Sequence, residues 1–385
     1  MAFYKKIMII HAFLLVCIAI RLEARPLNVL FVVAYFPAPS QTYILNLMTG
    51  LLDHGHNISI LSFLKKKCEN PHPNIEEYSL MDHVIYGTES QLPNCDIVFC
   101  QSATLANRML KNKALQQWLA DKKIAVCLRG HDITKNSLKK DSNLYAELFE
   151  RAHLFLPVCD YFKQLLIKLG CPVEKIIVHH SGIDGSQFFF KERKKPEKGY
   201  IRFVSVCRLI EKKGLEYALQ AFATVFKEYK NILFTIIGDG PLKVKLRKLI
   251  KKLKLEKKII LFGWGNQDQI VKILNQSHIF LLPSITAQNG DEEGIANALK
   301  EAMAMGLVTV GSWHAGTPEL IADGESGFLV PQKNSQALAS KIKYIIEHPE
   351  IWRAIGITAR LKIEDEFESK KIVKQLEQLF YELIR

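Results

Sequence analysis

The sequence lacks the cysteine patterns that indicate a metal site or a disulfide framework. Its 385 residues include eight cysteines, none beyond Cys207, and no two of them are spaced as CxxC. Zinc ligation therefore has no support from spacing. Most of the cysteines lie in apolar runs, for example Cys100 in CDIVFC and Cys127 in IAVCL. We expect buried free thiols in a reducing compartment rather than a disulfide framework, and no metal site.

The chain also lacks long apolar runs of the kind that cross a membrane repeatedly. Its mean hydropathy of +0.04 is too low for a polytopic membrane protein. One apolar run, Ile7–Ile20, follows two lysines, and as a helix it would extend roughly 21 Å, short of the ~30 Å hydrocarbon core. Residues 1–25 therefore predict a cleaved signal peptide, a membrane-associating segment, or an extension upstream of a domain that begins near Pro26.

Acidic residues are too few to balance the basic ones. There are 52 Lys+Arg against 39 Asp+Glu, a net charge of +13. This excess predicts an anionic partner, which could be nucleic acid, an acidic membrane surface or a phosphorylated ligand. The apolar fraction of 48% and charged fraction of 24% exclude wholesale disorder and fibrous repeats, and the length fits two domains, or three.

Short β-rich runs alternate with longer amphipathic stretches along most of the chain. In the first half we predict strands at Asn28–Phe36, Ile58–Phe63, Asp96–Gln101, Ile124–Leu128, Leu154–Val158 and Ile176–His180. The helices predicted between them include Thr42–His54, Ala103–Asp121 and Asp160–Leu169. Continuous apolar runs such as NVLFVVAYF are typical of buried parallel strands.

A polar, basic stretch at residues 191–199, KERKKPEKG, predicts an interdomain linker. After it we predict strands at Ile201–Val206, Ile232–Ile237, Ile259–Phe262, Ile279–Leu282 and Val308–Val310. The helices predicted there are Gly214–Glu228, Leu242–Leu253, Gln267–Asn275 and Ala296–Met305, with a mostly helical remainder.

Repeated β-α units predict parallel sheets covered on both faces, so the fold class is α/β with two facing Rossmann-like domains. The cleft between them is the expected ligand site.

The segment NGDEEGIANALKEAMAMG carries the most informative acidic residues. Glu293 lies just before the predicted helix Ala296–Met305, and Glu301 lies inside it. Gly294 allows close approach of a ligand to the backbone, and the helix N-terminus near Ile295–Asn297 favours an anion such as phosphate. The alternative is that the acidic residues only stabilise the start of a helix.

Two basic residues follow the predicted strand Ile201–Val206. Arg208 in SVCRLIEKKG comes directly after it, and Lys213 is five residues further on. A guanidinium and an ammonium at the carboxyl end of a strand suit a diphosphate. The alternative is a solvated basic loop, which is the interpretation we give to Lys212.

Glycine turns at 238–241 (GDGP) and 263–265 (GWG) could approach a nucleotide through Gly238 and Gly263, although neither matches GxGxxG and no Walker A sequence occurs.

In this order, SVCRLIEKKG, IIGDGP, LFGW, EGIANALKEAMAMG and AGTPELI resemble the motifs of retaining glycosyltransferases of family 4. The N-terminal stretch YFPAPSQTYILNLMTGLLDHGHNISILSF is similar to colanic-acid-type exopolysaccharide glycosyltransferases of that family. The resemblance implies a GT-B fold and a final helix that packs back on the N-terminal domain. The expected division is a signal-like segment at 1–25, domains at 26–190 and 200–365 joined by the linker at 191–199, and the returning helix at 366–385.

The resemblance also implies roles for individual residues. Arg208 and Lys213 match the pair that holds the donor diphosphate, Glu301 the residue that bonds the ribose, and Glu293 the acid beside the donor sugar. The backbone of residues 294–297, which includes Ala296, would contact sugar hydroxyls and phosphate oxygens. Catalysis is expected to rest on Glu293, Arg208 and Lys213, without a cofactor or metal, which agrees with the lack of a DxD motif.

The N-terminal side of the expected cleft departs from the family pattern. Where many members have His-Gly-x-Asp, this chain has Arg129, Gly130, His131 and Asp132, which puts proton shuttling at the first position in doubt. Where many members have a glycine pair, this chain has PAPSQ, so contacts there would use Ser40 and Gln41. His314 in SWHAG and the pair His179–His180 could also line the cleft.

Residues 243–258 hold nine Lys/Arg and one Glu threaded with Leu and Ile. They could form a membrane-surface helix or bind nucleic acid, but we favour the solvated face of an ordinary surface helix. Without a nucleic-acid module, we expect no nucleic-acid partner.

The expected reaction is hexose transfer from a UDP- or GDP-sugar to a glycan or lipid-linked acceptor. The alternatives are a GT-B-type nucleotide-sugar epimerase and a non-enzymatic protein that binds anionic lipid or nucleic acid through residues 243–258. Nucleotide sugars are made in the cytosol, so we expect a cytoplasmic enzyme, peripheral on the inner membrane, with export as the minor alternative.

Overall fold

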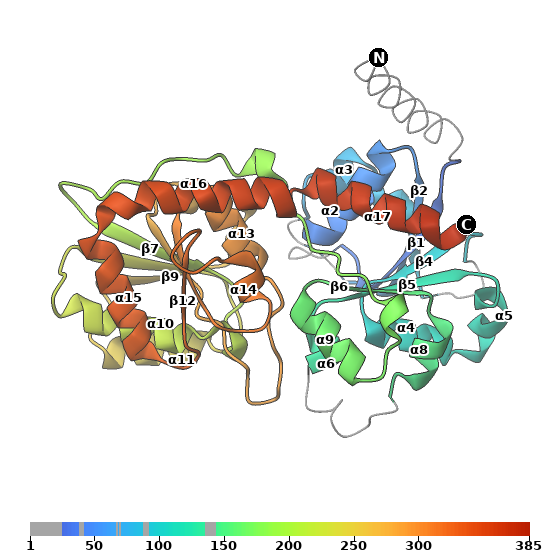
Figure 1. Cartoon of the computed structure of the whole chain (residues 1–385), viewed down its shortest axis with the longest axis horizontal. Helices are drawn as coiled ribbons and strands as arrows, with labels where there is room; N and C mark the ends of the chain where they lie inside the picture. Colours follow the sequence, from blue (N-terminus) through green and yellow to red (C-terminus); the bar gives the residue numbers. More distant parts are fainter. Residues whose placement is uncertain (1–24, 38–41, 67, 69–70, 88–91, 135–143) are drawn as a thin grey trace, which may run out of the picture.

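A computed structural model describes residues 25–37, 42–66, 68, 71–87, 92–134 and 144–385 of the chain. It contains two six-stranded parallel sheets, each with helices on both faces, set side by side (Figure 1). The N-terminal domain is the first sheet with its helices, and the C-terminal domain is the second. The predicted fold class of two facing Rossmann-like domains is confirmed.

The first sheet has the strand order β3-β2-β1-β4-β5-β6. Its strands are β1 (Asn28–Tyr35), β2 (Asn57–Leu64), β3 (Val84–Tyr86), β4 (Ile97–Cys100), β5 (Lys123–Leu128) and β6 (Leu154–Pro157). The helices are α2 (Thr42–Asp53), α3 (Asn74–Glu77), α4 (Ala103–Leu110), α5 (Gln116–Leu119), α6 (His131–Thr134), α8 (Ala146–Arg151) and α9 (Asp160–Lys168).

The second sheet has the order β12-β11-β10-β7-β8-β9. Its strands are β7 (Ile201–Val206), β8 (Ile232–Ile237), β9 (Ile259–Gly263), β10 (Ile279–Leu281), β11 (Val308–Ser312) and β12 (Phe328–Val330). The helices are α10 (Leu215–Phe226), α11 (Lys243–Lys252), α12 (Gln267–Asn275), α13 (Asn297–Ala304), α14 (Thr317–Leu320), α15 (Ser335–Glu347), α16 (Trp352–Lys362) and α17 (Ser369–Ile384). In both sheets the chain reverses its direction of progress beside the first strand of the domain, β1 or β7, which is where ligands bind in such folds.

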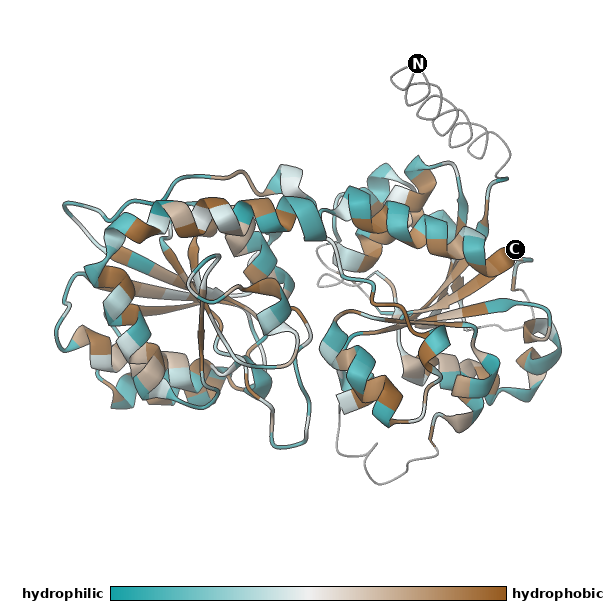
Figure 2. Ribbon diagram, in the orientation of Figure 1, coloured by the Kyte–Doolittle hydropathy of each residue, from teal (hydrophilic) through white to brown (hydrophobic). Residues whose placement is uncertain are grey.

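The strands are apolar along their length and the helices are apolar on one side (Figure 2). β4, for example, has four buried residues in a row, as expected when both faces of a sheet are covered. One buried apolar cluster continues from the first sheet across the domain boundary to α13, through residues such as Phe162, Ile295 and Leu299. The two domains therefore share a core.

Four details of the predicted element order are wrong. The three-residue strands β3 and β12 were not predicted, because three residues are too short to show a period. Residues 176–180 form a single bridge, from Ile176 to Phe155, rather than a strand. The predicted helix Ala103–Asp121 is broken after α4, where Asn112 accepts a hydrogen bond from the backbone of Ala114 and so favours a turn.

The C-terminal helices connect the two domains. α16 lies on the C-terminal domain, and α17 continues across the N-terminal domain (Figure 1). α17 buries Ile372, Val373, Leu376 and Phe380, and the Phe380 ring meets Phe99 edge-on at a centroid distance of 5.3 Å. The C-terminal helix therefore packs back on the N-terminal domain, as the family resemblance implied, and it does so with the apolar face on which its buried residues recur.

The segment at residues 191–199 contains no helix or strand, but it is not simply solvated. Arg193 is only 4% exposed, and its guanidinium donates to the carbonyls of Asn275 (2.7 Å) and Met305 (2.8 Å). This arginine ties the segment to the C-terminal domain.

Five of the seven described cysteines are buried, as their apolar surroundings predict.

Residues 1–24 lie outside the described residues, so the interpretations of that segment stay predictions. Among the helices that the structure describes, none combines the length and the apolar character needed to cross a membrane.

Replacing Phe380 with alanine should lower the free energy of unfolding by about 3–5 kcal/mol, because it leaves a cavity between α17 and the first sheet. Denaturant titration of the full chain would measure the change. Lys374→Ala, on the exposed side of the same helix, is the matched control and should shift stability by less than about 0.5 kcal/mol. Equal stabilities of the two variants would contradict this account of α17.

Candidate active site

A cleft of about 1140 Å³ separates the two domains. One side, the C-domain wall, is built from the segments that follow β7, β8 and β9 and from the start of α13. The other side, the N-domain wall, is built from the segments that follow β1, β4 and β5. The cleft is therefore formed where the carboxyl ends of two parallel sheets face one another, as the alternating pattern predicted.

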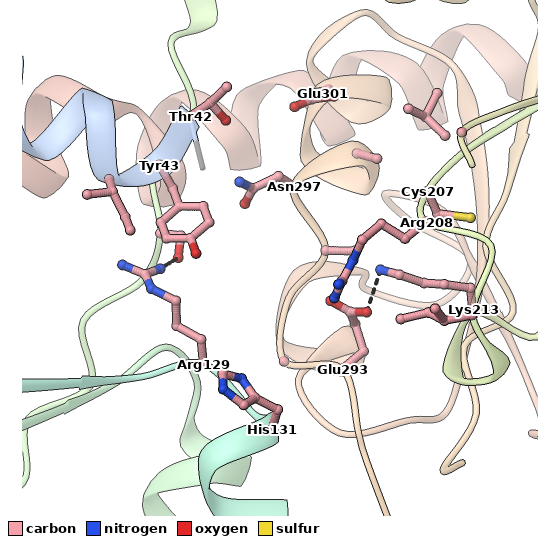
Figure 3. Close-up of a pocket in the computed structure, with 18 of the residues that line it drawn as sticks. Thr42, Tyr43, Arg129, His131, Cys207, Arg208, Lys213, Glu293, Asn297 and Glu301 are labelled. Carbon is pink, nitrogen blue, oxygen red and sulfur yellow. Dashed lines mark hydrogen bonds and ion pairs between the residues drawn. The ribbon is translucent and has the colours of Figure 1, made fainter. Parts of the chain in front are cut away.

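Most of the predicted site residues line this cleft. On the C-domain wall these are Arg208, Lys213, Gly238, Glu293, Gly294, Ile295, Ala296, Asn297 and Glu301, and on the N-domain wall Arg129 and His131. Figure 3 shows Arg208, Lys213 and Glu293 on one side and Arg129 and His131 on the other. Ser40 and Gln41 lie outside the described residues, so their contacts stay predictions.

Gly263 does not line the cleft, contrary to its predicted position. It is the last residue of β9, and its carbonyl accepts a hydrogen bond of 2.7 Å from the backbone of Gly238. The neighbouring Trp264 and Gly265 line the cleft instead. Gly263 therefore supports the turn at Gly238 rather than a ligand.

Asp132 is also misplaced by the prediction. Its side chain is buried, and it accepts hydrogen bonds from the backbone of Ala103 (3.0 Å) and of Gly130 (3.2 Å). These bonds join the start of α4 to the loop before α6. Aspartate is the residue type expected at this position, but its carboxylate binds backbone N–H groups behind the N-domain wall and does not line the cleft.

An ion pair between Lys213 and Glu293 lies on the C-domain wall (Figure 3). The two side chains are only 11% and 16% exposed, so the pair is shielded from solvent. Burial alone would raise the pKa of Glu293, but the charges of Lys213 and Lys212 outweigh it and hold that pKa well below its usual range. Glu293 is therefore an anion at neutral pH.

Lys212 is not the solvated lysine that the sequence predicted. It is 7% exposed, and its ammonium donates to the carboxylate of Asp291 (3.1 Å) and to the carbonyl of Glu292 (3.0 Å). The loop after β7 thus holds the acidic segment 291–293 through two neighbouring lysines. Lys212 and Asp291 both lie in motifs recognised in the sequence, but the sequence did not show that their side chains contact one another.

His314 lies behind the wall rather than on it. It is 1% exposed, and its Nε2 accepts a 3.0 Å hydrogen bond from the backbone N–H of Glu293. Burial lowers the pKa of His314, which keeps the ring neutral and able to accept. His179 is likewise buried and bonds to the carbonyl of Ile372, so neither histidine lines the cleft.

Arg208 differs from Lys213 in having no carboxylate partner. Among the described residues no ion pair includes Arg208, and its side chain is exposed to the cleft. The turn at Gly238 packs against this loop: a Cβ there would stand 1.9 Å from the carbonyl oxygen of Cys207, and its φ is +138°. Glycine is therefore required at position 238 to support the segment that carries Arg208.

The start of α13 faces the cleft with its backbone. The N-cap residue, Ala296, makes no side-chain cap, so the first N–H groups of the helix have no acceptor from it. Glu301, one turn further on, also lines the cleft, and burial raises its pKa to about 7 although the charge of Lys300 opposes this. This end of the wall combines a helix N-terminus that has no side-chain cap with a carboxyl group whose pKa is about 7.

Arg129 dominates the N-domain wall. Its guanidinium stacks on Tyr43 at 3.8 Å from the ring centroid and donates to Ser181 Oγ (2.5 Å) and Gln101 Oε1 (3.4 Å). It has no ion pair with a carboxylate among the described residues. The result is a fixed cation on the wall opposite Arg208 and Lys213 (Figure 3).

Sequence reasoning missed several cleft-lining residues, among them Thr42, Tyr43, His72, Gln101 and Trp264. Two of them had a usable signal. Gln101 directly follows β4, and Tyr43 stands in the first turn of the helix after β1, so both lie near carboxyl ends of strands. Within the described part of the chain, no group of three or more His, Cys, Asp or Glu side chains is arranged to hold a metal ion.

The cleft and its motifs match known proteins. A sequence model of the family described as "Glycosyl transferases group 1" matches residues 186–362. A protein of Salmonella typhimurium named as the colanic acid biosynthesis glycosyltransferase WcaL is 31% identical over 404 residues, covering 92% of this chain and 99% of that protein. The amylovoran biosynthesis glycosyltransferase AmsK of Erwinia amylovora is 32% identical, with the same coverage of 92% and 99%.

Solved structures show the same fold. A glycosyltransferase of Rickettsia africae has a TM-score of 0.73 at 20% identity, covering 94% of this chain and 100% of that one. Anabaena HepE in complex with UDP and glucose has a TM-score of 0.73 at 18% identity, covering 92% and 100%. These likenesses support the GT-B fold, while the narrower assignment to family 4 stays a prediction. The chain belongs to the group 1 glycosyltransferase family that includes the proteins named for colanic acid and amylovoran biosynthesis.

Proposed function

We propose that the protein transfers a hexose from a UDP- or GDP-sugar to a hydroxyl of a glycan or lipid-linked acceptor, with retention of the anomeric configuration. The observation that carries this proposal is the C-domain wall. It brings Arg208, Lys213, Glu293 and the open start of α13 together along one side of a cleft large enough for two substrates.

The diphosphate would lie against Arg208, Lys213 and the first amides of α13. Arg208 has no carboxylate partner among the described residues, so its charge is available for the phosphates. Lys213 would share its ammonium between Glu293 and a phosphate oxygen. Two cations and a helix N-terminus stabilise the charge that develops as the nucleoside diphosphate leaves. We therefore propose that the leaving group is stabilised by the protein without a metal or other cofactor.

Glu293, held as an anion, would lie beside the donor sugar, and Glu301 would accept hydrogen bonds from the ribose. In the proposed reaction the C1–O bond to the diphosphate breaks, and the acceptor oxygen bonds to C1 on the same face. The departing phosphate oxygen takes the acceptor proton. This course suits the N-domain wall, where Arg129 replaces a histidine, because it requires no base at position 129.

The names of the relatives favour a role in exopolysaccharide synthesis, with lipopolysaccharide and glycolipid synthesis as related settings. HepE was solved with UDP and glucose, which favours a uridine donor for the first tests. Membership of the glycosyltransferase family favours transfer over the epimerase and over a non-enzymatic role for α11. A thermal-shift screen with UDP, GDP and several nucleotide sugars would identify the donor.

We also propose that the enzyme acts at the cytoplasmic face of the inner membrane, where cytosolic nucleotide sugars are available. The exposed side of α11 supports contact with anionic lipid. Arg247, Lys248, Lys251 and Lys252 are exposed, and none of them forms an ion pair among the described residues. Such a surface gains about 1 kcal/mol per basic residue near an anionic membrane.

Replacing Arg208 with alanine should weaken UDP binding and lower turnover at least ~100-fold, about 2.7 kcal/mol, because it removes one of two cations from the leaving group. Steady-state kinetics and calorimetry would measure both effects. Arg202→Ala is the matched control, because this exposed arginine lies on β7, the strand that precedes Arg208, but does not line the cleft. Lys213→Ala should have a similar effect, although it also leaves Glu293 without its partner. Unchanged turnover in both cleft variants would contradict the proposal.

Donor affinity should rise with pH through the titration of Glu301. Its pKa of about 7 leaves the carboxyl mostly protonated at pH 6 and ionised at pH 8, and the ionised form is the stronger acceptor for ribose hydroxyls. Binding of a UDP-sugar, whose phosphates do not titrate in this range, should strengthen about threefold to tenfold from pH 6 to pH 8. Glu301→Gln should bind with little dependence on pH. An equal pH dependence in the variant would exclude Glu301 as its source.

Vesicles of anionic lipid should retain the full chain at low salt and release it as salt rises. Replacing Arg247, Lys248, Lys251 and Lys252 with glutamine should reduce the bound fraction several-fold without changing donor turnover in solution. Co-sedimentation with anionic and with neutral vesicles would measure this. Retention of the glutamine variant at the wild-type level would show that α11 is not the contact.

A further inference from the structure

Glu292 is the residue through which the N-terminal domain holds the acidic segment 291–293. Its carboxylate accepts hydrogen bonds from Tyr161 Oη (2.9 Å) and from Thr286 Oγ1 (2.9 Å). Its backbone N–H donates to Thr134 Oγ1 (3.2 Å), and its carbonyl accepts from Lys212. Tyr161 and Thr134 belong to the N-terminal domain, and Thr286 and Lys212 to the C-terminal domain. Both domains therefore fix this residue.

A second contact joins α9, the helix that contains Tyr161, to the C-terminal domain. Both carboxylate oxygens of Glu319 accept hydrogen bonds from the first turn of α9, from the backbone of Asp160 (2.8 Å) and of Tyr161 (3.1 Å). An acidic side chain of one domain thus caps a helix of the other. Tyr161 is held at its backbone by Glu319 and reaches Glu292 with its hydroxyl.

The backbones of the two domains are in close contact at this point. A Cβ on Gly130 would stand 2.9 Å from the carbonyl oxygen of Glu292, and a Cβ on Gly294 would stand 2.9 Å from both Phe162 and Val158. Only glycines allow this approach. Residues 292 and 294 therefore touch the N-terminal domain, while Glu293 between them points to Lys213 in the cleft.

Neither Tyr161 nor Glu292 lines the cleft, so neither can touch a substrate there. Glu293, by contrast, lines the cleft, as do Asp291 and Gly294. The backbone of Glu293 moves together with the backbone of its neighbours Glu292 and Gly294. A displacement of about 1 Å at a reacting group is enough to lower a rate substantially. Burial and the carboxylate of Glu292 raise the pKa of Tyr161 to about 12, so its hydroxyl remains a donor at neutral pH.

We propose that Tyr161 is a positioning residue. Its hydrogen bond to Glu292 couples docking of the two domains to the placement of Glu293 beside the donor. The inference rests on the proposed function, since it assigns Tyr161 an effect on that same site. It places a determinant of turnover in α9, a helix on the far side of the domain boundary from the donor.

The test compares Tyr161→Phe with wild type in the full chain. The variant loses one hydroxyl and keeps the ring, whose centroid lies 5.9 Å from that of Phe162. We expect kcat to fall about tenfold while the calorimetric affinity for UDP stays within about twofold, because the cations that bind the diphosphate are untouched. In a Glu292→Ala background, Tyr161→Phe should cost nothing further, because the bond is already absent.

Tyr78→Phe is the matched control. It removes the same kind of bond, from a phenol to the carboxylate of Asp53 (2.9 Å), at a site that does not line the cleft. It should leave kcat unchanged. A fall in kcat of equal size in both tyrosine variants, or an additive loss in the Glu292→Ala background, would overturn the assignment.

Amide hydrogen exchange gives a readout that needs no activity. Peptides covering residues 288–295 should exchange about tenfold faster in Tyr161→Phe than in wild type or Tyr78→Phe, because the segment has lost the side-chain hydrogen bond that joins Glu292 to the N-terminal domain. Unchanged exchange together with unchanged kcat would overturn the inference. Absence of transferase turnover in the wild type with every nucleotide sugar would refute the proposed function instead, and exchange would still decide the role of Tyr161.

Discussion

The buried ion pair between Lys213 and Glu293 is the interaction on which the C-domain wall depends. Its partners come from different β-α units, the loop after β7 and the segment before α13. Removing either partner would leave an unpaired charge in a shielded position, which is costly. Lys212, the neighbour of Lys213, forms a second ion pair with Asp291, which lies two residues before Glu293. Two adjacent ion pairs therefore fix two loops against one another and shape the wall before any donor binds.

The cleft is a property of both domains together. α17 belongs in sequence to the C-terminal half but packs on the N-terminal sheet, and a shared apolar cluster runs beneath the cleft from Phe162 to Leu299. Glu319 and Glu292 add polar contacts to α9 at the edge of that cluster. The placement of the acidic segment is consequently decided by contacts from both domains.

Local motifs predicted the C-domain wall well. Arg208 was placed correctly in the cleft because it follows a strand end, and Glu301 because it lies one turn into the helix whose start faces the cleft, and parallel α/β topology directs both positions to one edge. Lys212, Gly263 and Asp132 were interpreted wrongly for a common reason. Lys212 was interpreted as solvated, and Gly263 and Asp132 as lining the cleft, but the partner of each is a backbone group or carboxylate elsewhere in the fold that no local pattern reveals. Tyr43 and Gln101 were missed although both lie near carboxyl ends of strands, because nothing local shows that they contact the Arg129 guanidinium.

The sequence by itself determined the two sheets, the order of the motifs and the family resemblance. These depend on periodicity and on short segments whose chemistry is contained within a few residues. Tertiary structure decided which charges are paired and which are free. Arg208 and Arg129 face the cleft without carboxylate partners among the described residues, whereas Lys212 and Lys213 are paired. That distinction arises from contacts between segments distant in the sequence, such as Lys212 with Asp291, which are 79 residues apart, because a charge shielded from solvent is costly unless it is paired.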